Sequence, residues 1–360
     1  LAPDGRNVVY ALREADVAAN KATTSLWMQA LDGKAAARRL TAASSSAMAP
    51  QFAPDGRALY FLSARSGSTQ VWRLPLGGGE AEQVTGYPLD VGSYKIAPDG
   101  KTLAFSLEVF NDCEDLACTE KRLSEREASK VSGVLYERLF VRHWDTWADG
   151  RRNQLFTAAI DAQGKAAAEP VKVSRDIDGD VPSKPFGGAD EYTWSPDGKS
   201  LVFSVRIAGK SEVWSTNFDL YRVPADASSK PINLTADNPA MDTGPVFSAD
   251  GKHLYYMAMK RPGFEADRLA LMEKNLATGA TREIAPNWDF SAGGITLSAD
   301  GKSIYTTVDD TGTHPIHRID IATGKAQRLP GVGRIEGFDV GRDALVFTRS
   351  TLTSPAQLFV

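Results

Sequence analysis

Charged and aromatic side chains are concentrated between residues 134 and 156, in the segment VLYERLFVRHWDTWADGRRNQLF. An arginine such as Arg142 can fix a peptide carbonyl or carboxylate through paired hydrogen bonds. A carboxylate such as Glu137 or Asp145 can hold a peptide amine, and Trp144 can form one wall of the pocket. We therefore take these four residues as candidates for binding a peptide.

The same segment also has a purely structural interpretation. It could form an extra strand in which an arginine and an aspartate such as Arg142 and Asp145 pair across a neighbour and Trp144 fills the core. On such a strand the side chains of Arg142 and His143 would face opposite sides. Both interpretations remain open at the level of the sequence.

Two cysteines, Cys113 and Cys118, stand in the acidic stretch NDCEDLACTE. They could be unpaired thiols, part of a metal site, or a local disulfide. No second Cys or His pair lies nearby to complete four metal ligands, which makes metal binding the weaker choice. We predict a disulfide and, with it, an oxidising compartment, so that the protein would be periplasmic or secreted.

Motifs for other chemistry are absent or incomplete. The G-x-S-x-G turn that carries a nucleophilic serine does not occur in the 360 residues. The stretch DIDGD (176–180) copies part of a calcium loop, but its glycine is one position early and no Glu follows at the twelfth place, so we interpret it as a turn. We predict no cofactor and no metal, and we expect the chain alone to catalyse nothing.

A repeated unit must position these residues. The phrase WSPDGKSLVFS (194–204) recurs with small changes, and its six copies place an Asp-Gly turn at Asp4, Asp55, Asp99, Asp197, Asp250 and Asp300. Asp-Gly favours a tight turn with positive φ, and the alternating apolar residues after it have the period of a half-buried strand. Each copy therefore predicts a β-hairpin.

A third apolar strand and a short closing strand follow each hairpin. The turns are 51, 44, 98, 53 and 50 residues apart, and a degraded seventh copy puts Asp343 a further 43 along. Four-stranded units at this spacing predict an all-β protein, a seven-bladed β-propeller. The double interval holds one further pair of strands, so we place an insertion in blade three, at 108–150, rather than an eighth blade. Blades one and seven lack strands, which predicts that residues 1–360 are a piece of a longer protein.

The composition fits a single globular β domain. Hydrophobic residues make up 42% of the chain, its net charge is -4, and its pI is near 5.7. Lys and Arg residues are scattered, which gives no basic patch for nucleic acid. No apolar run in the sequence approaches the length of a membrane span.

The SPDGK phrase followed by LVFS, together with YERLFVRHWDTW and PFGGADEYTWSPDG, resembles the N-terminal propeller of the prolyl oligopeptidase family of serine peptidases. The Arg-His-Trp-Asp stretch is most similar to the bacterial dipeptidyl-peptidase 5-like and acylaminoacyl-peptidase-like members. The resemblance implies a C-terminal α/β-hydrolase domain with a Ser-Asp-His triad after residue 360, to which the propeller admits short peptides. It also implies that Arg142 and the nearby Glu137 help to hold the N-terminal end of the peptide.

A non-enzymatic alternative stays open, because the Asp-Gly phrase is shared with periplasmic TolB-like propellers that act as protein-binding scaffolds. Related dipeptidyl peptidases hold the substrate amine with a paired-glutamate motif, and this chain has no adjacent Glu-Glu. The resemblance therefore leaves dipeptidyl and acylaminoacyl release as two options. A hydrolase domain with G-x-S-x-G beyond residue 360 would decide for the peptidase.

Overall fold

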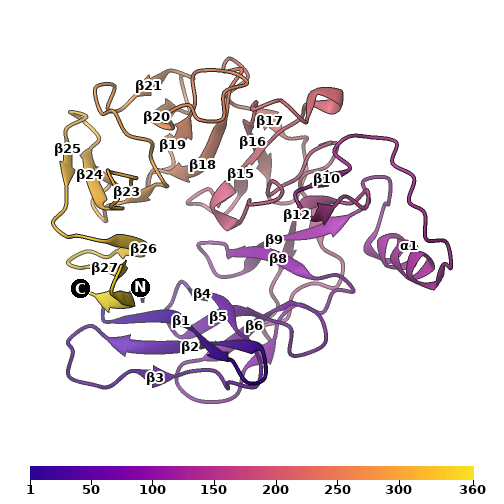
Figure 1. Cartoon of the computed structure of the whole chain (residues 1–360), viewed down its shortest axis with the longest axis horizontal. Helices are drawn as coiled ribbons and strands as arrows, with labels where there is room; N and C mark the ends of the chain where they lie inside the picture. The colour runs from indigo at the N-terminus through magenta and orange to yellow at the C-terminus, as the bar shows by residue number, and fades with distance from the viewer.

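The computed structural model describes every residue from Leu1 to Val360, and it shows seven antiparallel sheets arranged in a ring (Figure 1). Five sheets have four strands each, and the first and last sheets have three. The predicted seven-bladed β-propeller is confirmed. The long interval between Asp99 and Asp197 holds no separate blade beyond the strands of blade three and the start of blade four.

Strands follow one another across each blade in sequence order. Blade one has β1 (Asn7–Asp16), β2 (Lys21–Ala30) and β3 (Arg38–Arg39), and blade seven has β26 (Arg334–Val340), β27 (Leu345–Thr351) and β28 (Ser354–Phe359). Blades two and three have β4 (Met48–Phe52), β5 (Ala58–Ser63), β6 (Gln70–Pro75) and β7 (Glu82–Gln83), then β8 (Val91–Ile96), β9 (Thr102–Val109), β12 (Arg152–Ala159) and β13 (Val171–Lys172). Blade four has β14 (Tyr192–Trp194), β15 (Ser200–Val205), β16 (Asp219–Pro224) and β17 (Ile232–Asn233). Blades five and six have β18 (Asp242–Phe247), β19 (His253–Ala258), β20 (Ala270–Asn275) and β21 (Thr281–Glu283), then β22 (Thr296–Leu297), β23 (Ser303–Thr307), β24 (Ile316–Asp320) and β25 (Ala326–Arg328).

The six Asp-Gly turns are built in the same way. The carboxylate of Asp55 accepts a hydrogen bond from the backbone N–H of Arg57 at 2.9 Å, and Gly56 has a φ of 70°. A side chain at that φ would be strained, which is why glycine follows the aspartate. The aspartate bond recurs, at 2.9 to 3.1 Å, at Asp4, Asp99, Asp197, Asp250 and Asp300. The repeated phrase is therefore the chemical requirement of one type of turn.

Buried apolar side chains join each of the first five blades to the next. Five clusters lie at the boundaries between blades one and two, two and three, three and four, four and five, and five and six. The largest has 17 buried residues and includes Leu62 of blade two and Phe105 of blade three. Blade seven contributes no residue to these clusters, and its buried apolar side chains are Ile335 and Val346.

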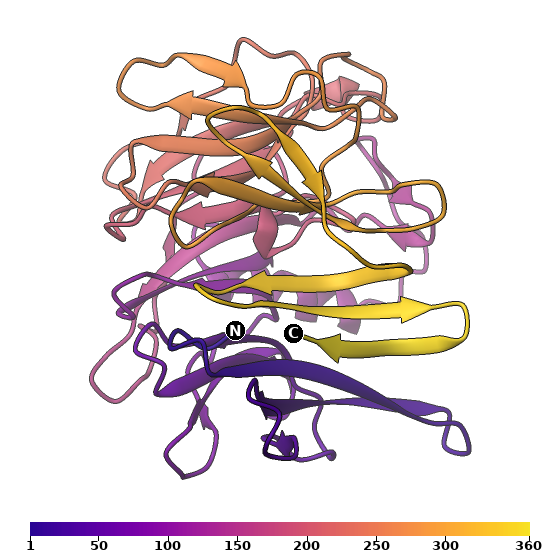
Figure 2. The ribbon, with the colours of Figure 1, turned by 90° about the vertical axis from the view of Figure 1, so that its left-hand side faces the viewer.

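Blade seven lies beside blade one, so that the two ends of the chain meet (Figures 1 and 2). The amino group of Leu1 is 2.6 Å from the carboxylate of Asp339 on β26.

One face of the ring carries the insertion. In an antiparallel blade, the connection between strands two and three and the connection to the next blade emerge on the same side. We call this side the insertion face, because the β9–β12 connection is part of it, and the Asp-Gly turns lie on the opposite side. The connection contains α1 (Leu116–Ala128) and a ribbon of β10 (Arg142–His143) and β11 (Thr146–Trp147).

Helix α1 projects from the outside of the ring (Figure 1). It begins at Leu116, directly after Asp115, which caps it. The Asp115 carboxylate accepts a hydrogen bond from the backbone N–H of Cys118 at 2.8 Å. A disulfide links Cys118 to Cys113, which precedes the helix. None of the helices combines the length and the apolar character needed to cross a membrane.

Candidate functional site

Two arginines of α1 hold the insertion against blade three. The guanidinium groups of Arg122 and Arg126 lie 4.5 and 4.6 Å from the ring centre of Phe110. Arg122 also donates two hydrogen bonds to Asp112, at 2.9 and 2.8 Å, and these bonds lower the pKa of the Asp112 carboxyl. Arg126 donates to the backbone carbonyl of Asp149 at 2.5 Å. Both ends of the insertion are thereby tied to the helix.

Arg142 is exposed at the start of the β10–β11 ribbon. Its guanidinium lies over the ring of Trp147, 5.4 Å from the ring centre, and its Nη1 donates to the carbonyl of Trp144 at 3.1 Å. No carboxylate lies within ion-pair distance of it. The planar guanidinium is therefore held in place while most of its N–H donors stay free for another acceptor.

Trp144 is 71% exposed and stands at the tip of the ribbon. Its ring centre lies 5.2 Å from that of Phe186, which comes from the connection between β13 and β14. His143 contacts both rings and also Phe140. We call Phe140, His143, Trp144 and Phe186 the aromatic cluster. It forms an apolar wall on the insertion face. The His143 side chain belongs to this wall, whereas the Arg142 side chain lies over Trp147.

The two predicted carboxylates, Glu137 and Asp145, are both exposed, and neither makes a hydrogen bond or an ion pair. Asp145 does not pair with Arg142, and Trp144 does not fill the core. The alternative in which this segment is an ordinary extra strand is therefore wrong. Before β12, the only strands in this segment are the two short strands β10 and β11, which have two residues each. Most of 129–141 has no neighbouring strand with which to pair.

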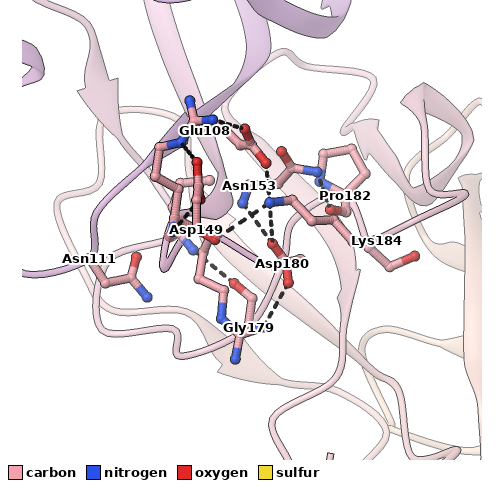
Figure 3. Close-up of polar contacts among 12 residues, drawn as sticks. Glu108, Asn111, Asp149, Asn153, Gly179, Asp180, Pro182 and Lys184 are labelled. Carbon is pink, nitrogen blue, oxygen red and sulfur yellow. Dashed lines mark hydrogen bonds and ion pairs between the residues drawn. The ribbon is translucent and has the colours of Figure 1, made fainter. Parts of the chain in front are cut away.

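Beneath the insertion lies an ion cluster that the sequence analysis missed. Arg152, at the start of β12, donates to Asp180 at 2.8 Å and makes two hydrogen bonds of 2.7 Å to Glu212. Glu108, at the end of β9, pairs with Lys184 and with Arg151, the latter at 2.9 Å. Figure 3 shows Glu108, Lys184 and Asp180 meeting in this arrangement. We call these six residues the ion cluster.

Burial and ion pairing shift the pKa values of the ion cluster in opposite directions. The hydrogen bonds to Glu212 raise the pKa of Arg152 above its ordinary value, so this arginine stays charged. Burial raises the pKa of the Asp180 carboxyl, although Lys184 and Arg152 act in the opposite direction. The backbone N–H of Asn153 also donates to Asp180, at 2.8 Å. The ion cluster joins the start of β12 to two connections. Asp180 and Lys184 lie in the connection from β13 to β14, and Glu212 lies in the connection from β15 to β16.

A small polar pocket lies beside the ion cluster. Arg206, which lines it, also contacts the aromatic cluster, because its guanidinium lies 6.0 Å from the ring centre of Phe140 and 5.1 Å from that of Phe218. Burial lowers the pKa of Arg206. The pocket is lined by Asp180, Ser183, Lys184, Arg206, Glu212 and Phe218. Charged and aromatic groups thus meet at the boundary between blades three and four.

A sequence signal for the ion cluster existed in the stretch DIDGD. We predicted a turn there, and the structure has a turn at 175–176, but Asp178 and Asp180 also make ion pairs with Arg138 and Arg152. The sequence signal was the presence of two acidic residues, Asp178 and Asp180, together with the Arg151-Arg152 pair at the start of a strand. Such a combination favours ion pairing. Glu212 had no such signal, because it lies 60 residues from Arg152.

Comparisons with known proteins agree with this architecture. The family model for the N-terminal domain of the acylamino-acid-releasing enzyme matches residues 6–71. The chain is 28% identical to a dipeptidyl-peptidase 5 of Porphyromonas gingivalis over its whole length, which is 51% of that relative. The chain is homologous to the N-terminal region of dipeptidyl and acylaminoacyl peptidases. This homology confirms the resemblance predicted from the repeated phrase together with the segments YERLFVRHWDTW and PFGGADEYTWSPDG.

Solved structures show the same fold as this homologous region. An acylaminoacyl peptidase in complex with Z-Gly-Gly-Phe-chloromethyl ketone matches with a TM-score of 0.71 and 17% identity, over 98% of this chain and 49% of that one. TolB from Acinetobacter baumannii matches with a TM-score of 0.51 and 16% identity, over 91% of this chain and 64% of that one. The chain spans about half the length of the curated Porphyromonas relatives it matches.

Proposed function

We propose that this propeller is the substrate-gating domain of a serine exopeptidase that releases dipeptides or acylaminoacyl groups from short peptides. The observation that carries the proposal is the homology over the entire chain to the dipeptidyl-peptidase 5 of Porphyromonas gingivalis. The nucleophilic serine and its partners would belong to an α/β-hydrolase domain outside residues 1–360. The propeller would limit access to that domain and orient the peptide.

Arg142 is the residue that we assign to the peptide. Its guanidinium is oriented by Trp147 but has no carboxylate partner, so its free donors can reach a backbone carbonyl. Trp144, whose ring contacts that of Phe186 at a tilted angle, would form one wall of the peptide site. Glu137 and Asp145 are unpaired carboxylates on the same segment, which suits them to hold a peptide amine.

The hydrolase domain is the partner that we assign to the insertion face. Large exposed aromatic side chains gather there, and they include Trp144, Trp147, Phe186 and Trp214. Each stands in a connection between strands two and three or in a connection to the next blade. Exposed apolar surface of this kind is typical of an interaction site. Covering this face would also enclose the peptide site.

Replacing Arg142 by alanine in the protein that carries the hydrolase domain should lower kcat/KM for short peptides by about 10-fold or more. That is the scale of losing one or two charge-assisted hydrogen bonds that position the scissile bond. Hydrolysis of a small ester that cannot reach the propeller should stay nearly unchanged. The measurement is steady-state kinetics on both substrates.

Arg138→Ala is the matched control, because Arg138 lies in the same segment but is paired with Asp178 at 3.0 Å. It should leave kcat/KM for peptides within about 2-fold of the parent value, since it removes an exposed ion pair. An equal loss on peptide and ester for Arg142→Ala would indicate misfolding. No loss on either substrate would remove Arg142 from the site.

We also propose that the protein acts in the periplasm or is secreted. The support is the disulfide between Cys113 and Cys118, since such bonds persist in oxidising compartments. Mass spectrometry without reduction, on protein from its native compartment, should find both thiols blocked, and Cys118→Ser should leave Cys113 open to alkylation. Two thiols that alkylate without a reductant would count against export.

A further inference from the structure

A groove between blades six and seven lies away from the insertion. Its floor is formed by the apolar side chains of Ile316, Leu329, Leu345 and Phe347. Leu345 and Phe347 alternate along β27, so they project from the same face of the strand. No cluster of buried residues fills the boundary between these two blades, and Leu345 and Phe347 are half-buried there, while Ile316 is buried.

One arginine ends the apolar row. Arg349 follows Phe347 on the same face of β27 and lines the groove. Its guanidinium lies 4.2 Å from the ring centre of Phe359, which orients it, and no carboxylate pairs with it. A half-buried arginine without a counter-charge attracts an anion.

The loop across the groove offers further donors. Gly331, Val332 and Gly333 connect β25 to β26, and their three backbone N–H groups donate to no acceptor in the protein. A Cβ atom on Gly331 would lie 3.6 Å from Nη1 of Arg349, so the loop and the guanidinium are neighbours. Successive free N–H groups beside a cation are a recurrent way of binding an anion.

We propose that this groove binds an apolar carboxylate, a molecule with a carboxylate head and an apolar tail. Arg349 and the N–H groups of 331–333 would hold the head, and Leu329, Leu345 and Phe347 would cover the tail. A peptide with an apolar C-terminal residue and a fatty acid share this chemistry. The site is distinct from the peptide site assigned to Arg142 and does not depend on it.

The test is a binding titration followed by NMR on the 360-residue chain. N-acetyl-L-phenylalanine represents a peptide end and octanoate represents a fatty acid. At least one should bind with shifts confined to 315–316, 329–335 and 345–349, and the stronger of the two identifies the source. N-acetyl-L-phenylalaninamide, which lacks the charge, should bind about 10-fold more weakly than its acid.

Arg349→Gln should weaken binding of the acid by about 10-fold or more, because it removes charge-assisted hydrogen bonds. Arg342→Gln is the matched control, since Arg342 is an exposed arginine of the same blade outside the groove. Val332→Glu changes an exposed side chain at the rim and should repel the acid while sparing the amide. The proposal is overturned if acid and amide bind equally, or if both Arg349→Gln and Val332→Glu bind the acid as the parent chain does.

Discussion

Replacing Arg152 by glutamine should lower the free energy of unfolding by about 3 to 5 kcal/mol, the range for removing one partner of a buried ion pair. The side chains of Glu212 and Asp180 are 9% and 10% exposed, and Arg152 is hydrogen-bonded to both. Without it, two acidic groups would stay buried beside one another with Lys184 and Arg206 as the remaining cations nearby. Chemical denaturation of the two chains measures the difference.

Arg138→Gln is the control, because it removes an ion pair from the same region whose side chains are 76% and 49% exposed. It should change the free energy of unfolding by less than about 1 kcal/mol. Adding Glu212→Gln to Arg152→Gln should restore part of the lost stability, since it removes one of the unpaired charges. Equal stability of the Arg152 and Arg138 variants would contradict a structural role for the ion cluster.

The contribution of Asp242 to the stability of the chain should fall as the pH rises from about 4 to about 7. Asp242, the first residue of β18, is 1% exposed, and its Oδ2 has no hydrogen-bond partner. Burial raises its pKa to about 7, although hydrogen bonds from Asn238 and Thr235 oppose the shift and nearby Asp219 adds to it.

The sign follows from proton binding. Between the ordinary pKa of an unfolded aspartate, near 4, and about 7, the folded chain holds a proton at Asp242 that the unfolded chain has released. Raising the pH through this range therefore favours unfolding. At about 1.4 kcal/mol for each pKa unit, the loss from this one group is about 4 kcal/mol.

Asp242→Asn separates this effect from that of other acids. The variant keeps the size of the side chain and its contact with Asn238 but cannot ionise. Its free energy of unfolding should match the parent chain near pH 4 and exceed it by about 4 kcal/mol at pH 8, as measured by denaturation across the pH range. A difference between the two chains that does not vary with pH would show that folding does not raise the pKa of Asp242.

The ring of blades could be predicted from the sequence because the Asp-Gly turn repeats. The Asp55 bond to the N–H of Arg57 and the left-handed Gly56 need no partner outside the turn, so each copy reports its own hairpin. The length of one interval then located the insertion.

The site was less predictable, because its parts meet only after folding. Arg152, Asp180 and Glu212 are 28 and 60 residues apart along the chain and come from different blades. Arg142 and Trp144 could be chosen from the sequence by residue type. Their surroundings could not be predicted, since the ring of Phe186 that contacts Trp144 comes from a separate connection.

The boundary clusters also determine how the molecule comes apart. Each cluster joins two neighbouring blades. Each blade is therefore stabilised by its contacts with the next, as the units of a repeat protein are. Blade seven stands outside this chain of clusters and buries Ile335 and Val346 alone. Its strands are therefore the cooperative unit with the lowest opening free energy, and they can detach while the six-blade arc stays folded.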